Sequence, residues 1–190
     1  MKNTYVDPLI EYGHKINADI KEELGVLSPE QFNWKPAPDS WSAGQCVDHL
    51  KTTLAQYEPI FAALLEDRKP SNFWEKVPFL PGMWGGMLKS FTQPDIKRKI
   101  KTVPVFEPTK SEVLLSVIDA FIERQQGLFN SMRQLDGLDH AKTIVTSPAS
   151  QFITYSLKDA FAILCMHPER HLNQARNVLK MSAFPQQEQV

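Results

Sequence analysis

The chain has 190 residues, of which 42% are hydrophobic and 23% charged, and its formal net charge at pH 7 is -1. These values suit one globular domain with a sizeable core and give no reason to expect nucleic acid or an acidic membrane as a partner. The first 23 residues are too polar for a signal peptide, no stretch could span a bilayer, and only two cysteines occur. We therefore expect a cytoplasmic protein without disulfides.

The first helix is predicted to begin near Asp7 and Pro8, because proline suits the first turn of a helix. Apolar residues then recur with spacings of three, four and seven as far as Leu27. Residues 28–31 are typical of a new N-cap followed by a short helical turn.

The second helix is predicted to begin at Ser42, which forms a capping box with Gln45 three residues later. It should end at residues 68–70. Its inward-facing stripe comprises Cys46, His49, Leu50, Thr53, Leu54, Tyr57 and Phe61.

Residues 71–108 are dense in proline, glycine and aromatic side chains, which predicts a long irregular crossover with a short helix at 83–91. We interpret the aromatic stretch 73–84 as a lid over one end of the bundle or a dimer contact, with a substrate pocket as the alternative. The basic residues 97–101 most simply form a solvated loop, so no nucleic-acid partner is expected.

The third helix is predicted at 109–135, because Thr109 and Glu112 have capping-box spacing and Gly137 is a natural stop. Its expected inward residues are Val113, Leu114, Val117, Ile118, Phe121, Leu128 and Leu135. The fourth helix should start at Ser156 or Leu157 and end near Lys180. We expect no regular sheet, although 143–146 could be briefly extended.

These elements indicate an all-α fold. They predict a single domain at 1–183 and a disordered C-terminal tail at 184–190.

The sharpest chemical feature is the pair His167 and His171, because residues four apart project from the same face of a helix. His49 in the second helix is the candidate third ligand. Three imidazoles suit zinc or nickel and leave coordination positions open. The spacing alone favours the simpler interpretation that these histidines pack or bond to carbonyls. His14 and His140 have no spaced partner and are expected to face solvent.

Several neighbours of these histidines could contribute to the same site. Arg170 and Gln174 flank the pair and could support the ligands or contact a substrate, although Arg170 could equally form a surface ion pair. Cys46 could offer a thiol but more simply belongs to the core. Pro168 follows His167 directly and should kink the helix, which would either open room for substrate or spoil the ligand geometry.

Two blocks of sequence resemble the DinB-like superfamily. The first reads W-K-P-A-P-D-S-W-S at 34–42 and leads to His49. The second reads I-T-Y-S-L-K-D-A at 153–160 and continues to His167 and His171. The resemblance implies a four-helix bundle in which these three histidines hold one divalent metal ion.

The superfamily includes thiol S-transferases and metal-dependent hydrolases. The resemblance therefore implies a metal-dependent enzyme that acts on a small molecule, such as a transferase for a low-molecular-weight thiol. The alternative is a non-catalytic metal-binding or small-molecule-binding bundle that works through a dimer surface. A homodimer is the commonest assembly of soluble proteins and is the expected one here.

Overall fold

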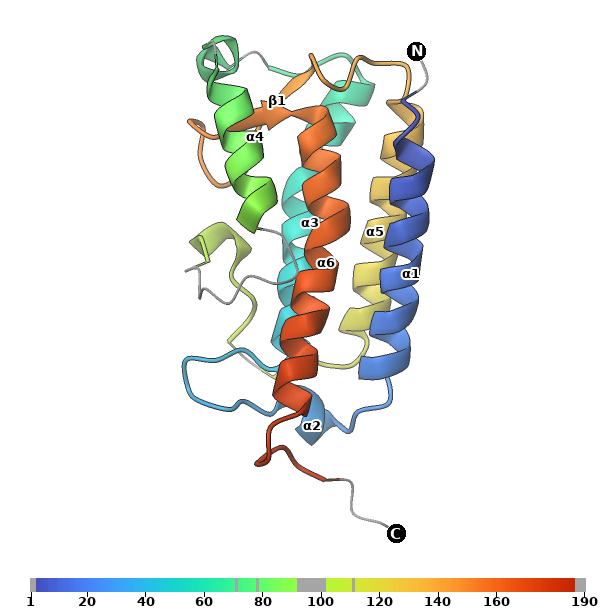
Figure 1. The fold of residues 1–190 in the computed structure, drawn as a ribbon, viewed down its shortest axis with the longest axis vertical. Helices are drawn as coiled ribbons and strands as arrows, with labels where there is room; N and C mark the ends of the chain where they lie inside the picture. The colour runs from blue at the N-terminus through green and yellow to red at the C-terminus, as the bar shows by residue number, and fades with distance from the viewer. Residues whose placement is uncertain (1–2, 71, 78, 92–101, 111, 187–190) are drawn as a thin grey trace.

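The computed structural model describes residues 3–70, 72–77, 79–91, 102–110 and 112–186. Four long helices form a bundle: α1 (Val6–Leu24), α3 (Ala43–Leu65), α5 (Val117–Gln134) and α6 (Leu157–Leu179) (Figure 1). The short helices are α2 (Pro29–Asn33) and α4 (Leu80–Phe91), with 3-10 turns η1 (Phe73–Lys76) and η2 (Pro104–Phe106). The all-α class is confirmed.

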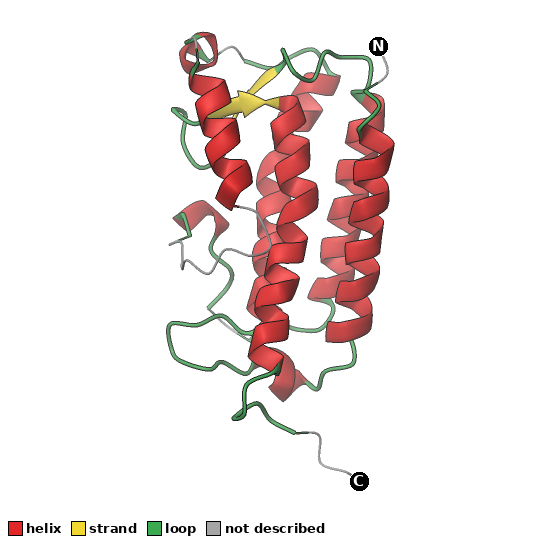
Figure 2. Ribbon diagram, viewed as in Figure 1, coloured by secondary structure: helices red, strands yellow, loops and turns green. Residues whose placement is uncertain are grey.

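One small antiparallel ribbon joins the bundle, and Figure 2 shows it beside the start of α6. Its strands are β1 (Ile144–Thr146) and β2 (Thr154–Ser156), with Val145 opposite Tyr155. The sequence indicated only a brief extension at 143–146 and missed the partner strand. Both Val145 and Tyr155 are fully buried, so the ribbon stabilises the fold by closing one end of the core.

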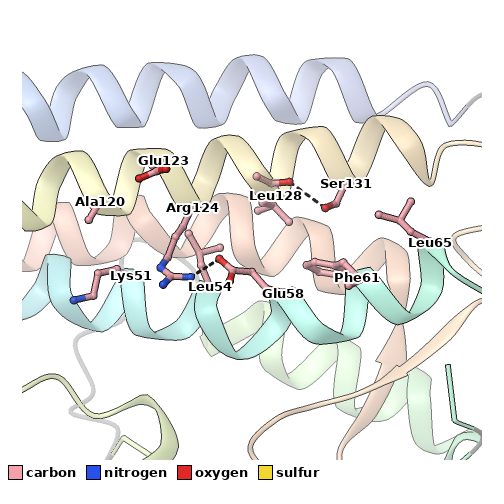
Figure 3. A pocket seen from close by; sticks show the side chains of 12 residues that line it. Lys51, Leu54, Glu58, Phe61, Leu65, Ala120, Glu123, Arg124, Leu128 and Ser131 are labelled. Atoms are coloured by element: carbon pink, nitrogen blue, oxygen red, sulfur yellow. Dashed lines mark hydrogen bonds and ion pairs between the residues drawn. The ribbon is translucent and has the colours of Figure 1, made fainter. Parts of the chain in front are cut away.

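Two neighbouring pairs of helices, α3 with α5 and α1 with α6, run parallel, and the first pair explains the need for a long crossover. In Figure 3 the labelled residues rise in number in the same direction along α3 and α5. On the other side of the bundle, α1 and α6 are also parallel, since Tyr12 bonds Glu169 and, further along, Glu23 bonds Arg176. Parallel neighbours cannot be joined by a tight turn. The chain therefore runs the length of the bundle again between α3 and α5.

The helix starts at α2, α3 and α6 are fixed by local side-chain caps. Ser42 accepts a hydrogen bond from the Gln45 N–H at 3.1 Å, and the Gln45 side chain accepts from the Ser42 N–H in return. Ser28 and Gln31 form a second such box at α2, and Ser156 caps α6 through the Asp159 N–H. The capping box that the sequence predicts at Ser42 is therefore confirmed.

The third bundle helix begins eight residues later than the sequence predicts. Asn33 binds both backbone groups of Val113, accepting from its N–H at 2.7 Å and donating to its C=O at 3.0 Å. Thr109 is bound in the same way by side chains of α3, as described below. These bonds hold the segment outside a helix, so α5 starts at Val117 and Leu114 is exposed rather than inward. Ser111, inside the predicted capping box, lies outside the described residues.

The aromatic stretch packs over the ribbon end of the bundle. Trp74 contacts Phe152 edge to face with ring centroids 5.0 Å apart, and the Thr154 hydroxyl lies 3.4 Å from the Trp74 carbonyl. In α4, a Cβ added to Gly85 would lie 2.3 Å from the Asp159 carboxylate, so only glycine allows this close approach to α6. These contacts attach this part of the chain to the ribbon and to the start of α6. The basic residues 97–101 lie outside the described part of the chain.

Two expectations about exposure were wrong. His140 is fully buried rather than solvent-facing: its Nε2–H donates to the Leu135 carbonyl at 2.8 Å, and its Nδ1 accepts from the Tyr5 hydroxyl at 2.6 Å. Phe184 is not part of a disordered tail, because its ring is buried and packs edge to face against Trp34. Exposing an apolar ring that has a packing partner costs more free energy than ordering the segment that carries it.

The core between the four helices is continuous and rich in rings. Its fully buried side chains include Phe32, Phe121, Phe129, Phe161 and Tyr155. Each such residue stabilises the fold by about 1.5–3 kcal/mol relative to an exposed position. None of the helices in the described part of the chain combines the length and apolar character needed to cross a membrane.

Candidate metal centre

Three histidines that are far apart in the sequence meet between α3 and α6. His49 comes from the first half of α3, while His167 and His171 lie one turn apart on α6. One ring nitrogen from each histidine can be chosen so that all three lie within 4.8 Å of one another. His49 and His171 are buried and His167 is half-buried. The structure thus brings together the three residues that the sequence singled out.

The tautomer of His49 is fixed by the backbone. Its Nδ1 lies 2.6 Å from the carbonyl oxygen of Phe106, in η2. A carbonyl can only accept, so the proton of the neutral ring must sit on Nδ1. The lone pair then belongs to Nε2, which is the arrangement of a metal-ligating imidazole supported by a backbone carbonyl.

The electrostatic environment keeps all three rings neutral. Burial lowers the pKa of His49 to about 4, and this effect outweighs the opposing contribution of the Phe106 carbonyl. Burial also holds the pKa values of His167 and His171 well below the ordinary value, and the neighbouring histidines lower them further. At neutral pH each ring therefore offers a lone pair rather than a second N–H, as metal binding requires.

The donor geometry fits a small divalent ion. The Nε2 atoms of His167 and His171 are 2.8 Å apart. Ligands at about 2.05 Å from a zinc-sized ion lie roughly 2.9 Å apart in octahedral and 3.3 Å apart in tetrahedral coordination. The three ring centroids are separated by 4.5–5.1 Å, so no ring must move far to share one ion.

Trp41, just before the N-cap of α3, forms one wall of this cluster. Its indole stacks on His171 with centroids 5.8 Å apart, and it contacts His49 at 4.9 Å. Sequence reasoning treated Trp41 only as part of the first block and did not assign it to the site. The signal was present, because a tryptophan directly before the cap of the ligand-bearing helix must lie near its first turns.

Pro168 does not interrupt α6, which is one helix from Leu157 to Leu179. Its missing N–H removes the bond to the Leu164 carbonyl, yet the two histidines on either side of it still converge. Pro168 therefore does not break the helix at the ligand pair. Its ring is buried, so packing compensates for part of the lost hydrogen bond.

Arg170 brings positive charge to the site. Its charge lowers the pKa of all three histidines, although less than burial does. Burial in turn lowers the pKa of Arg170 itself. Arg170 has no ion-pair partner within the described residues, so the surface ion pair considered from the sequence is not formed there.

Gln174 lies one turn after Arg170, and its side chain interacts with His171 in a way that favours the charged imidazole. The Nδ1 atom of His171 is buried and has no hydrogen-bond partner among the described residues. A glutamine amide at this position can accept the N–H of a metal-ligating ring.

Cys46 is a buried thiol and not a member of the histidine cluster. Burial raises the pKa of Cys46 to about 12, so the sulfur stays protonated at neutral pH. A thiol ligand must be deprotonated, and desolvation without a nearby cation opposes this. Within the described residues the cluster contains only the three histidines. Cys46 therefore serves packing here.

A separate groove lies between α3 and α5, on a face that the histidines do not line (Figure 3). Its volume is about 540 Å³. The side chain of Arg124 reaches across it to Glu58, with the two charged groups 2.5 Å apart. The ion pair is partly exposed to solvent, so it contributes little to stability.

Comparison with known proteins bears on the family rather than on the reaction. The family model described as the DinB superfamily matches residues 17–175. Searches of curated proteins and of solved structures returned no match. The matched range contains all three histidines and the whole of α3 and α5. Because the family model covers most of the bundle, the chain belongs to the DinB superfamily.

Proposed function

We propose that this protein is a metal-dependent enzyme that acts on a small molecule through one divalent ion held by His49, His167 and His171. The observation that carries the proposal is the convergence of three neutral imidazoles from two helices. Zinc and nickel are the ions that such a ligand set favours. Three protein ligands leave at least one position open, which is the mark of a catalytic rather than a structural site.

When bound, the ion would act as a Lewis acid that lowers the pKa of a water molecule or thiol beside it. The chain itself supplies the rest of the site. The Phe106 carbonyl orients His49, and Trp41 covers the rings of His49 and His171 and keeps water from that side.

The choice between transferase and hydrolase turns on Arg170. Its guanidinium has no ion-pair partner among the described residues, and its charge is felt by all three histidines. A cation near the three ligands favours an anionic reactant such as a thiolate over a neutral one. We therefore propose thiol S-transfer as the reaction, with a low-molecular-weight thiol as one substrate and hydrolysis as the second candidate.

The first experiment measures the metal content of the purified protein by mass spectrometry. About one equivalent of a transition metal is expected in the parent, and none in His49→Ala or His171→Ala. His14→Ala is the matched control, because His14 is an exposed histidine on α1 outside the cluster. Full metal content in His171→Ala, with the bundle folded by circular dichroism, would refute the ligand assignment.

The second experiment tests the reaction. Transfer of a small thiol to an electrophile should depend on added metal and stop when a chelator is present. A protein that binds metal and gains thermal stability from it, but transfers no thiol and hydrolyses no ester or amide, would be a non-catalytic binding protein. Homodimer assembly and a cytoplasmic location stay predictions of the sequence.

A further inference from the structure

We propose that Asp48 and Gln45 are positioning residues for His49. They act by fixing the backbone of the segment 104–109, which supplies the carbonyl that orients the His49 ring. This inference rests on the proposed function insofar as His49 is a metal ligand. It concerns how the His49 ring is oriented for metal binding. It also predicts the tautomer of His49 in the metal-free protein.

The two side chains bind both backbone groups of one residue. The Thr109 N–H donates to the Oδ2 atom of Asp48 at 2.7 Å, and the Gln45 Nε2 donates to the Thr109 carbonyl at 2.8 Å. Side chains of α3 therefore bind both the N–H and the C=O of Thr109, as the backbone of a neighbouring strand does in a sheet. No regular secondary structure would otherwise fix this part of the crossover.

The same segment carries the partner of His49. Three residues before Thr109, the Phe106 carbonyl accepts the Nδ1–H of His49 at 2.6 Å. The Phe106 ring lies nearly flat against Tyr57, with ring planes 9° apart and centroids 6.5 Å apart. The segment is thus attached to α3 at successive levels, by Gln45 and Asp48 at one end and by Tyr57 at the other.

The surroundings of Asp48 fix its carboxylate in one orientation toward the Thr109 N–H. Its side chain is 7% exposed, and its other oxygen, Oδ1, lies 2.6 Å from the ammonium of Lys51. With both oxygens engaged, the carboxylate cannot rotate away from the Thr109 N–H. A charged acceptor also makes this hydrogen bond shorter and stronger than a neutral one.

Loss of the Asp48 contact should act on the ring of His49. Without it, the segment is held on α3 by Gln45 and by the Phe106 ring contact alone, so the Phe106 carbonyl is less firmly placed and the His49 proton can move between the two nitrogens. A ring with its proton on Nε2 cannot bind metal through that atom. Removal of such a support typically weakens metal binding by about 10- to 100-fold.

The test compares Asp48→Ala with Asp48→Asn. Alanine removes the acceptor for Thr109, whereas asparagine keeps an acceptor oxygen and removes only the charge. The first readout is the tautomer of His49 in the metal-free protein, from the nitrogen-15 shifts of its imidazole. The second readout is the affinity for zinc and for nickel, by competition with a chromophoric chelator.

Two controls separate positioning from general damage. Lys51→Ala removes the ion pair of Asp48 but leaves the Thr109 bond. Asn33→Ala frees the same crossover at Val113, away from His49. A second variant, Gln45→Glu, is isosteric and keeps the acceptor of the capping box while losing the donor to Thr109. Gln45→Glu replaces Asp48→Ala in the test if Asp48→Ala does not fold.

In the parent and in Asp48→Asn, the His49 proton should lie on Nδ1. Asp48→Ala and Gln45→Glu should show mixed tautomers and metal binding weaker by about 10- to 100-fold. Unchanged tautomer and affinity in both variants would overturn the proposal, as would equal losses in Asn33→Ala. If the parent binds no metal, the proposed function fails, and the tautomer of His49 in the same variants still decides this inference.

Discussion

The indole of Trp41 lies over the imidazole of His171, with ring planes 27° apart and centroids 5.8 Å apart. The same indole is 4.9 Å from the ring of His49. An ion shared by these two histidines would therefore lie within a few ångströms of an intrinsic fluorophore. The protein has three other tryptophans, and among the described residues none of them makes a ring contact with the three histidines.

Nickel should quench the fluorescence of Trp41. Open-shell ions quench indole emission at short range, so titration with nickel should lower the emission and saturate near one equivalent. Trp41→Phe should lose most of this response while it still binds nickel by equilibrium dialysis. Trp34→Phe is the control, since Trp34 packs on Phe184 instead. A response that persists undiminished in Trp41→Phe would place the ion elsewhere.

The metal-free protein should lose stability as the pH falls from about 6.5 to 4. The pKa of His49 is about 4 in the folded state and near 6.5 when unfolded, so the unfolded state binds more protons in this window. The stability is fully present above pH 6.5 and is lost as the pH falls toward 4. His49 alone accounts for roughly 3 kcal/mol of this change.

Urea unfolding at a series of pH values, in the presence of a chelator, measures this slope. In His49→Gln the slope between pH 6.5 and 4 should be shallower than in the parent, because one titrating group is removed. Carboxylates titrate in both proteins, so their contribution cancels in the difference. Parallel curves for the two proteins would show that His49 is not held neutral by burial.

Replacing Pro168 by alanine should leave metal binding unchanged. α6 is already one continuous helix through this position, and His167 and His171 converge with the proline in place. Alanine restores an N–H for the Leu164 carbonyl, worth about 1 kcal/mol, but gives up the buried contacts of the ring. Stability by urea unfolding should shift by less than about 1.5 kcal/mol. Loss of the metal equivalent in Pro168→Ala would mean that the proline sets the ligand geometry.

Gly13→Ala should destabilise the bundle where α1 meets α5. A Cβ at Gly13 would lie 2.5 Å from the ring of Phe129, which is fully buried and cannot move aside. Overpacking of this kind costs about 1–3 kcal/mol.

Gly127→Ala is the matched control for Gly13→Ala. It lies on α5, where an added Cβ meets nothing within 4 Å, so it should stabilise the helix by about 0.5–1 kcal/mol. Thermal unfolding of both variants gives the comparison. A stabilised Gly13→Ala protein would contradict the packing of these two helices.

The sequence predicted the helices whose starts are local. Ser42 and Gln45 carry their own signal, since a capping box needs only residues three apart. Thr109 and Glu112 carry the same signal and were misleading, because the backbone of Thr109 is bound by side chains of α3. A contact between residues about 60 positions apart leaves no trace in the local pattern.

For the candidate site, the sequence likewise predicted only the part that local spacing or the family resemblance indicates. The spacing of His167 and His171 on one helix face is local, and the resemblance supplied His49. The Phe106 carbonyl was not predictable, because any residue type can offer a backbone oxygen. The burial of His140 was missed for a similar reason, since its partners are the Leu135 carbonyl and a tyrosine at the far end of the chain.

The contact between Tyr5 and His140 sets a limit on how far the chain can be shortened. The tyrosine hydroxyl provides the donor for the Nδ1 atom of a fully buried imidazole, and Asn3 beside it bonds Asp136 at 2.7 Å. Trimming the first five residues would leave that nitrogen in the core without a partner, at a cost of about 1–3 kcal/mol. The residues before α1 thus cover the end of the bundle where α5 ends and α6 begins.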